Sequence, residues 1–409
     1  MNDIPAHVPA DRVFAFDIFD DPRLKPDLHL GYKQLHAEAP DIFYTPLNGG
    51  HWVVTRHAAI TDIIRDTAVF SSRNQEIPRT DQNTQMIPLT LDPPEHTPYR
   101  QIFMQLFAPS AMVALEPHVR EWTNRLIDKV IDDGECDFVR SISSALPVSV
   151  FMQMMGLPLD RLEEFREWVD GAFQATDTEE RMQLYGKIVG FMTTLIHARM
   201  EKREDDIISR LLDSEVGGRP VSFEEVQGMC LLLFIAGLDT VVNAMSFGVR
   251  HLADDPVLQE RFRTEPSVIL TAVEEFLRRY AFTNTCRIVA RNADYGGIHF
   301  KEGDMVFLAL ALAGLDERAT SDPLRFDADR KGLAHKTFGG GAHQCAGRHL
   351  ARIELRILFE ELTKRMVNLR LKPGAAPTFR AGFVMAVETL PVIFDAAELA
   401  PTSEIKALN

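Results

Sequence analysis

The sequence has few cysteines, and they lie far apart along the chain. The 409 residues contain four, Cys136, Cys230, Cys286 and Cys345, and no two of them form a CxxC pair. Disulfide-rich secreted domains and structural zinc sites are built on closely spaced cysteines. This spacing argues against both and favours a reducing compartment.

A net positive charge, a leader and long apolar runs are also missing. The net charge is −15 at pH 7, which argues against a general affinity for nucleic acid. The first residues show neither the basic nor the apolar segment of a signal peptide. The nearest candidate for a membrane span, Met229–Leu238, is cut short by Asp239. We therefore expect a cytoplasmic protein that does not cross a membrane.

No internal repeat or low-complexity linker divides the chain. Two β-like stretches around Asn48 and Gly49 predict a hairpin over residues 41–55. From about residue 56 to 280 apolar residues recur at three and four positions, which predicts mainly helix. Short β-like segments follow, such as Arg287–Ala290 and Met305–Leu310, and the part from about Val367 to Phe394 again indicates strands and turns. This order indicates one mainly α (α+β) domain.

The densest glycine cluster surrounds Cys345. Residues 338–347 read Phe-Gly-Gly-Gly-Ala-His-Gln-Cys-Ala-Gly, and a helical pattern follows directly. Glycine lets a backbone adopt positive φ and approach a large flat ligand. Free N–H groups at the start of a helix are expected to lower the pKa of the thiol and favour a metal-binding thiolate. An isolated cysteine in such a turn is more often inert, but this spacing is far more restrictive.

A long helix is predicted before the cysteine cluster. Ser222 and Glu225 form a capping-box pattern, and the apolar pattern continues to about Leu252. Its middle is interrupted by Gly237, Asp239 and Thr240. Asp and Thr side chains can bond to backbone carbonyls and open a helix locally. Alone, this pattern would also fit a kink whose polar pair is satisfied.

Together the two segments resemble the cytochrome P450 haem-thiolate monooxygenases. That family has Phe-Gly-x-Gly-x-x-x-Cys-x-Gly in its cysteine loop and [Ala/Gly]-Gly-x-[Asp/Glu]-Thr in its long central helix, and this chain matches both. The sequences at 237–243, 314–318 and 349–352 are closest to the bacterial camphor hydroxylase group. The resemblance implies a single P450-type domain over residues 1–409, with haem between the long central helix and the cysteine-loop helix. Its parts would be a β-containing N-terminal part at about 41–56, a helical body at about 57–280, and a β-containing and cysteine-loop part at about 281–398.

The resemblance also implies roles for individual residues. Cys345 would be the axial thiolate of haem b, with His343 as a weaker rival for the iron, and Asp239 and Thr240 would deliver protons to bound O₂. The haem contacts it implies are His96, Arg100, Gly237, Arg287, Phe338, Gly339, His343 and Gly347. A structural triad is implied for Glu275, Arg278 and Arg330, with Arg325 as the runner-up for the third place.

The substrate wall is implied by alignment on the camphor enzyme. Its residues are Thr84, Met86, Leu89, Leu232, Ile235, Thr283, Phe383 and Val384, which are mainly apolar. Thr84 stands where that enzyme has the tyrosine that holds the ketone of camphor. We therefore expect a different small terpenoid or norisoprenoid, with weaker or different polar anchoring.

Electrons must come from another protein, because no GxGxxG dinucleotide motif or flavin-like region is present. We expect a [2Fe–2S] ferredoxin with its ferredoxin reductase, attracted by a basic patch of Arg100, Arg348, His349 and Arg352. O₂ and a small apolar substrate are the other expected partners. The alternatives are a peroxide-driven peroxygenase, against which Asp239 and Thr240 argue, and a non-catalytic haem carrier or sensor.

Overall fold

The computed structural model of the chain describes residues 4–79, 85–165, 167–168 and 178–397. Its α-helices are α1 (Leu28–Glu38), α2 (His57–Arg65), α3 (His96–Leu106), α4 (Pro109–Val113), α5 (Glu116–Asp128), α6 (Ala145–Met154), α8 (Thr178–Glu201), α9 (Ile207–Leu212), α10 (Phe223–Asp254), α11 (Pro256–Thr264), α12 (Val268–Arg279), α13 (Leu310–Ala313) and α14 (Arg348–Arg365). Shorter 3₁₀ or π turns are η1 (Ala10–Arg12), η2 (Pro22–Leu24), η3 (Ile131–Asp133), η4 (Val139–Ser143), η5 (Leu159–Arg161) and η6 (Gly341–His343).

The strands are short and form small sheets. They are β1 (Ile42–Thr45), β2 (His51–Val54), β3 (Phe70–Ser71), β4 (Glu135–Asp137), β5 (Glu215–Val216), β6 (Arg219–Pro220), β7 (Thr285–Val289), β8 (Ala293–Tyr295), β9 (Ile298–Phe300), β10 (Met305–Leu308), β11 (Met366–Leu371), β12 (Thr378–Arg380), β13 (Ala386–Thr389) and β14 (Pro391–Ala396). The predicted mainly α fold with small sheets is confirmed.

The largest sheet joins strands from the N-terminal part of the chain to strands within residues 285–308. Its five strands run in the order β1-β2-β10-β7-β3, with β1 and β2 antiparallel and β10 parallel to β2. The predicted hairpin is present, and Asn48 and Gly49 take φ of 50° and 88° at its turn. A second sheet, β11-β14-β4, lies in the helical part of the molecule. Both sheets therefore brace the helical body with segments distant in sequence.

The predicted helical body contains strands that the sequence analysis did not foresee. β3, β4, β5 and β6 have two or three residues each, too few to show a period of two. The strand expected to reach Leu310 ends at Leu308, and α13 begins at Leu310. Elsewhere the change from helices to strands after α12 follows the prediction.

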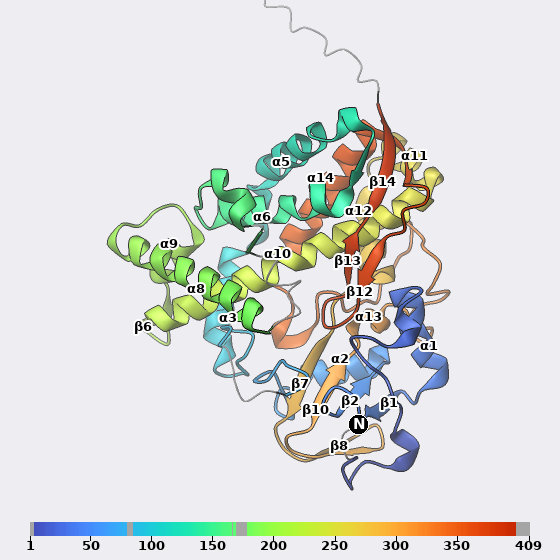
Figure 1. Cartoon of the computed structure of the whole chain (residues 1–409). Helices are drawn as coiled ribbons and strands as arrows, with labels where there is room; N and C mark the ends of the chain where they lie inside the picture. The colour runs from blue at the N-terminus through green and yellow to red at the C-terminus, as the bar shows by residue number, and fades with distance from the viewer. Residues whose placement is uncertain (1–3, 80–84, 166, 169–177, 398–409) are drawn as a thin grey trace, which may run out of the picture.

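Helix α10 crosses the middle of the molecule, and other helices pack along it (Figure 1). Its capping box is formed, since Ser222 Oγ accepts from Glu225 N and Glu225 Oε2 accepts from Ser222 N at 2.7 Å. By length and composition α10 could cross a membrane. The sequence did not predict this, because Asp239 interrupts the apolar run. However, 61% of its most apolar window is buried inside the protein, as in a core helix.

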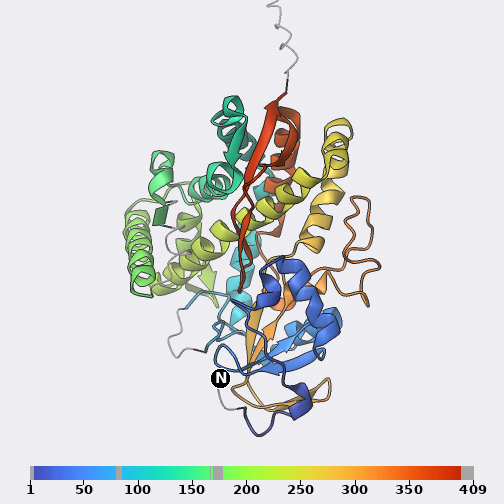
Figure 2. The same cartoon turned by 45° about the vertical axis from the view of Figure 1, so that its right-hand side comes forward.

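The arrangement brings the N-terminal sheet and the cysteine loop to the same part of the molecule. In Figures 1 and 2 the β1–β2 sheet and α2 lie at one end, and α10 and α14 lie in the helical body. η6 of the cysteine loop contacts α2, and α14 continues from that loop to contact α10. The loop is therefore held between the sheet end and the central helix.

Candidate active site

The cysteine loop is a rigid turn that ends at α14. Cys345 N donates to Phe338 O at 2.9 Å, and Gly339 N donates to Lys336 O at 2.7 Å. Gly339 and Gly341 have φ of 66° and 62°, in the left-handed region that favours glycine. The predicted turn is thus closed by backbone hydrogen bonds, with Cys345 three residues before α14 begins.

Cys345 differs from the other cysteines in its surroundings. Cys230 and Cys286 are buried and Cys136 is partly buried, whereas Cys345 is exposed. Burial raises the pKa of each of the other three thiols to about 12. Many protein atoms surround the Cys345 side chain, yet part of its surface is exposed. This is expected for a side chain in the wall of a hollow.

The expected lowering of the thiol pKa is not what the protein alone produces. Desolvation raises the pKa of Cys345, and the Gly347 N–H together with three arginine side chains opposes that rise without overcoming it. The N–H groups at the helix start therefore lower the pKa of the thiol by less than desolvation raises it. A bound metal ion would supply the charge that deprotonates a coordinating thiol.

Three donor side chains, His96, His343 and Arg287, meet at the loop without a carboxylate that satisfies them. The rings of His96 and His343 lie 4.5 Å apart. Among the described residues, His96 Nε2, His343 Nε2 and Arg287 Nε are buried and have no hydrogen-bond partner. Burial and the charges of Arg287, His96 and Arg100 lower the pKa of His343 to about 3.

This cluster fits a buried anionic group. The nearby carboxylate of Asp92 already accepts from Ser71 Oγ at 2.5 Å and from Ser72 N at 2.9 Å. Unsatisfied buried donors are costly, and a carboxylate is the natural partner for them. The donor set therefore suits the propionates of haem. His343 belongs to this cluster, which makes a role as iron ligand unnecessary.

The middle of α10 presents an open stripe inside a packed helix. Ala236 is exposed, and Leu232, Ile235 and Thr240 are half-buried, while Leu233, Phe234 and Leu238 are buried. The open positions are spaced by three and four residues, so they share one face of the helix. A flat cofactor and a small substrate could occupy the space along this stripe.

The polar residues of α10 do not break the helix. Thr240 Oγ1 donates to Ala236 O at 2.8 Å, and Asn243 Nδ2 donates to Asp239 O at 2.8 Å. The expected local opening of the helix is absent. The Thr240 and Asn243 side chains bond to backbone carbonyls, and the chain stays helical through this region. A Cβ added at Gly237 would lie 3.7 Å from Phe151, an ordinary contact, so packing does not demand glycine there.

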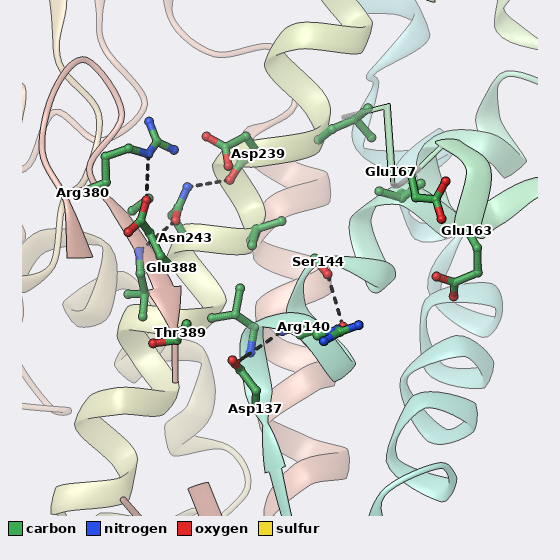
Figure 3. A pocket seen from close by; sticks show the side chains of 16 residues that line it. Asp137, Arg140, Ser144, Glu163, Glu167, Asp239, Asn243, Arg380, Glu388 and Thr389 are labelled. Atoms are coloured by element: carbon green, nitrogen blue, oxygen red, sulfur yellow. Dashed lines mark hydrogen bonds and ion pairs between the residues drawn. The ribbon is translucent and has the colours of Figure 1, made fainter. Parts of the chain in front are cut away.

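Asp239 lines a cleft of about 580 Å³ beside α10 (Figure 3). The cleft is rich in charge: Glu163 lies on one side, and Arg380 and Glu388 lie on the other, with Arg380 Nε 3.5 Å from Glu388 Oε1. Asp239 and Thr240 are neighbours in sequence. The cleft therefore places charged side chains around Asp239, which directly precedes Thr240 of the open stripe.

The predicted substrate residues fall into two groups. Met86 and Leu89 lie in the segment that packs on α10, where Ile87 N donates to Gly228 O at 3.3 Å. Thr283 and Val384 form a β-bridge next to Phe383. Thr283 Oγ1 donates to Thr337 O at 3.0 Å, just before the cysteine loop. These five residues, with Leu232 and Ile235, are half-buried, and Thr84 lies outside the described residues.

Glu275, Arg278 and Arg330 are joined as the sequence comparison suggested. Arg278 Nε lies 2.7 Å from Glu275 Oε2, and Arg330 Nε lies 3.1 Å from Glu275 Oε1. Arg325, the runner-up, contributes its backbone carbonyl, which accepts from both arginines. The three side chains tie α12 to the segment that leads into the cysteine loop.

The cations expected to form a basic patch for the ferredoxin also have partners within the protein. Arg352 is bound to Glu274 and lies over the Phe338 ring at 4.6 Å. Arg348 Nη1 donates to Cys345 O at 3.0 Å, and Arg100 donates to Gln344 O. These cations therefore brace the cysteine loop as well as charging the surface.

Sequence reasoning missed the residues that surround Asp239. Asn243 is 1% exposed and also accepts from Val387 N at 3.2 Å, so it joins α10 to β13. Arg380 and Glu388 lie far along the chain, and no local pattern links them to Asp239. The four-residue spacing of Asp239 and Asn243 on one helix face was the one available signal.

Comparisons with known proteins agree with this site. The family model "Cytochrome P450" matches residues 176–366. "Probable cytochrome P450 127A1" of Sinorhizobium fredii is 32% identical over 95% of this chain and 96% of that protein. "Linalool 8-monooxygenase" of Pseudomonas putida is 29% identical over 88% of this chain and 94% of its own length.

A solved structure extends the agreement to the whole fold. The crystal structure of CYP101J2 superposes with a TM-score of 0.90 at 33% identity, over 96% of this chain and all of that one. The cysteine loop, Arg287 and the open stripe of α10 lie within residues 176–366, which the family model matches. The chain therefore belongs to the cytochrome P450 family and is a bacterial-type P450 monooxygenase with haem b as its cofactor.

Proposed function

We propose that this P450 hydroxylates a small apolar terpenoid or norisoprenoid, using O₂ and two electrons from a ferredoxin. The observation that carries the proposal is the apolar, open stripe of α10, with Leu232 and Ile235 beside Thr240. Apolar walls with few polar anchors suit compact hydrocarbon-like molecules. The similarity to a linalool monooxygenase supports the same substrate class.

The haem, held by Cys345 and by the donors His96, Arg100, Arg287 and His343, would activate O₂ for insertion into a C–H bond. The protein's own part is to position the substrate and to move protons. Thr240 would turn its hydroxyl away from the Ala236 carbonyl and donate a hydrogen bond and a proton into the space along the open stripe. Asp239 would resupply that proton from the cleft.

The substrate would be held mainly by shape. Met86 and Leu89 would cover one side, while Phe383 and Val384 would cover the other, close to the bridge with Thr283. The Thr283 hydroxyl already donates to Thr337 O, so it is a weak candidate for a substrate anchor. Selectivity would therefore depend on size more than on a single hydrogen bond.

Electrons would come from a [2Fe–2S] ferredoxin that is recharged by its reductase. The proposed location is the cytoplasm, where such donors and the reduced cysteines coexist. The buried position of α10 fits this location.

An optical titration of the haem-loaded protein tests the substrate class. Ionones, linalool and camphor would be added in turn while the spin-state change of the Soret band is followed. We expect saturable shifts with ionones or linalool and a weaker response to camphor. A tight response to camphor alone, or to large steroids alone, would contradict the proposal.

A further inference from the structure

Thr283 is tied by its backbone to the expected substrate wall. It forms a β-bridge with Val384. The next residue, Asn284, donates its backbone N–H to Phe383 O at 2.7 Å. Because backbone hydrogen bonds hold the two segments together, a displacement of Phe383 or Val384 also displaces Thr283.

The side chain of Thr283 connects this wall to the cysteine loop. Its hydroxyl donates to Thr337 O at 3.0 Å, and Thr337 directly precedes Phe338, the first residue of the loop. In the part of the chain that the structure describes, no backbone N–H donates to Thr337 O. A carbonyl without a partner is costly inside a protein. The Thr283 hydroxyl therefore supplies a bond that this carbonyl needs.

Thr337 is fixed on its other sides as well. It is buried, and its own hydroxyl donates to Leu277 O near the end of α12. The same hydroxyl lies 3.2 Å from His335 Nδ1. A closely packed residue that is held in this way transmits a displacement to the next residue, because it has little room to rotate.

The next residue bonds directly to the iron-binding cysteine. Phe338 O accepts from Cys345 N at 2.9 Å. Two hydrogen bonds and one peptide group therefore separate the Thr283 hydroxyl from the backbone of Cys345. Groups that orient a metal ligand and its hydrogen bonds also tune the metal that it holds.

We infer that Thr283 is a positioning residue whose hydroxyl couples the substrate wall to Cys345. The inference rests on the proposed function, because it needs a substrate that lies against Phe383 and Val384. Such a substrate alters the bond from Thr283 to Thr337 O, and the cysteine loop carries the change to the sulfur ligand. An apolar wall alone would be served equally well by valine, which has the same shape without the hydroxyl.

Hydrogen–deuterium exchange of the haem-loaded protein tests the coupling. Thr283→Val removes the hydroxyl, and without substrate it should speed exchange in the peptide over residues 338–347 by about fivefold, as expected for the loss of one hydrogen bond. Thr283→Ser keeps the hydroxyl and should exchange like the wild type. Thr123→Val is the matched control, since the buried Thr123 hydroxyl donates to Val119 O at 2.7 Å within α5, and it should leave this peptide unchanged.

Addition of β-ionone tests whether the bond responds to substrate. β-Ionone should slow exchange of the same peptide by about fivefold in the wild type and in Thr283→Ser, and by much less in Thr283→Val. Its Kd, measured from the Soret shift, should change little, because the hydroxyl does not hold the substrate. The change in reduction potential that β-ionone causes should be smaller in Thr283→Val than in Thr283→Ser.

Equal exchange of the loop peptide in the wild type and Thr283→Val, with and without β-ionone, would overturn the inference. So would a Thr283→Ser protein that behaves like Thr283→Val, because the methyl group and not the hydroxyl would then be responsible. A wild type whose Soret band responds to no terpenoid would contradict the proposed function. In that case the substrate-free comparison of the Val and Ser variants still decides whether the hydroxyl holds the loop.

Discussion

Glu275 and Arg278 are joined by two hydrogen bonds of 2.7 Å, and both side chains are fully buried. Arg278 also donates to Gly314 O and Pro323 O, and Asp327 N donates to Glu275 at 3.0 Å. The Glu275–Arg278 pair therefore holds the segment between α13 and the cysteine loop in place. Its loss should mainly lower the stability of the folded protein.

Glu275→Gln should lower the free energy of unfolding by about 3–5 kcal/mol, because it leaves Arg278 buried without a counter-charge. Denaturant unfolding of the haem-loaded protein, followed by circular dichroism and by the Soret band, measures the loss. Glu260→Gln is the control, since Glu260 and Arg263 form an exposed pair at the same spacing. That change should cost no more than about 1 kcal/mol. Equal losses in the two variants would refute the structural role.

Cys345→His should remove the thiolate-type Soret band of the reduced CO complex, because a neutral nitrogen ligand replaces the sulfur. The absorption spectrum of the reduced, CO-treated protein records this directly. Cys136→Ala, a change at a partly buried cysteine in β4, should keep the band. An unchanged spectrum for Cys345→His would mean that another residue binds the iron.

Thr240→Ala should preserve substrate binding but lower the product formed per electron consumed by at least about tenfold, because the proton donor is lost. Product and hydrogen peroxide are both measured against NADH oxidised in the reconstituted system. Thr240→Ser keeps a hydroxyl able to donate to Ala236 O, so its coupling should stay near that of the wild type. Equal coupling in the Ala and Ser variants would remove Thr240 from the proton route.

Stability at low pH should depend on Glu225. Hydrogen bonds from Arg219, Tyr99 and Ser222 lower its pKa from 4.5 to about 2, with the Arg219 bond contributing most. Since the folded form binds its proton less readily than the unfolded form, the stabilisation is complete above pH 4.5. It is lost as pH falls from about 4.5 to about 2.

Glu225→Gln should therefore cost about 2 kcal/mol at pH 7 and little at about pH 2. Urea unfolding across this pH range measures the difference. Glu224→Gln, at the neighbouring position of the same helix turn, should not reproduce the pH dependence. A constant gap between the wild type and Glu225→Gln at all pH values would contradict the assignment.

The sequence predicted features that depend on neighbouring residues. The Ser222–Glu225 capping box located the start of α10, and Asn48 and Gly49 located the β1–β2 turn, because both signals act within a few residues. It could not show that β10 lies beside β2, or that β14 pairs with β4, since those contacts join distant segments. Those pairings depend on the packing of the whole chain.

The residues of the candidate site also fall into those that local sequence predicts and those that depend on tertiary packing. Cys345 and Thr240 stand in local motifs that sequence can reveal. The meeting of His96 and His343, and the bond from Thr283 to Thr337, depend on tertiary packing. The pKa of Cys345 was predicted wrongly because desolvation depends on surroundings that local sequence does not describe.

We propose that this protein inserts one atom of O₂ into a small terpenoid with electrons from a ferredoxin. The most direct test is turnover under ¹⁸O₂ with ferredoxin, its reductase, NADH and an ionone or linalool, analysed by mass spectrometry. We predict a hydroxylated product carrying one ¹⁸O atom, formed only when the ferredoxin is present. Oxidation of NADH without a labelled product from either substrate would contradict the claim.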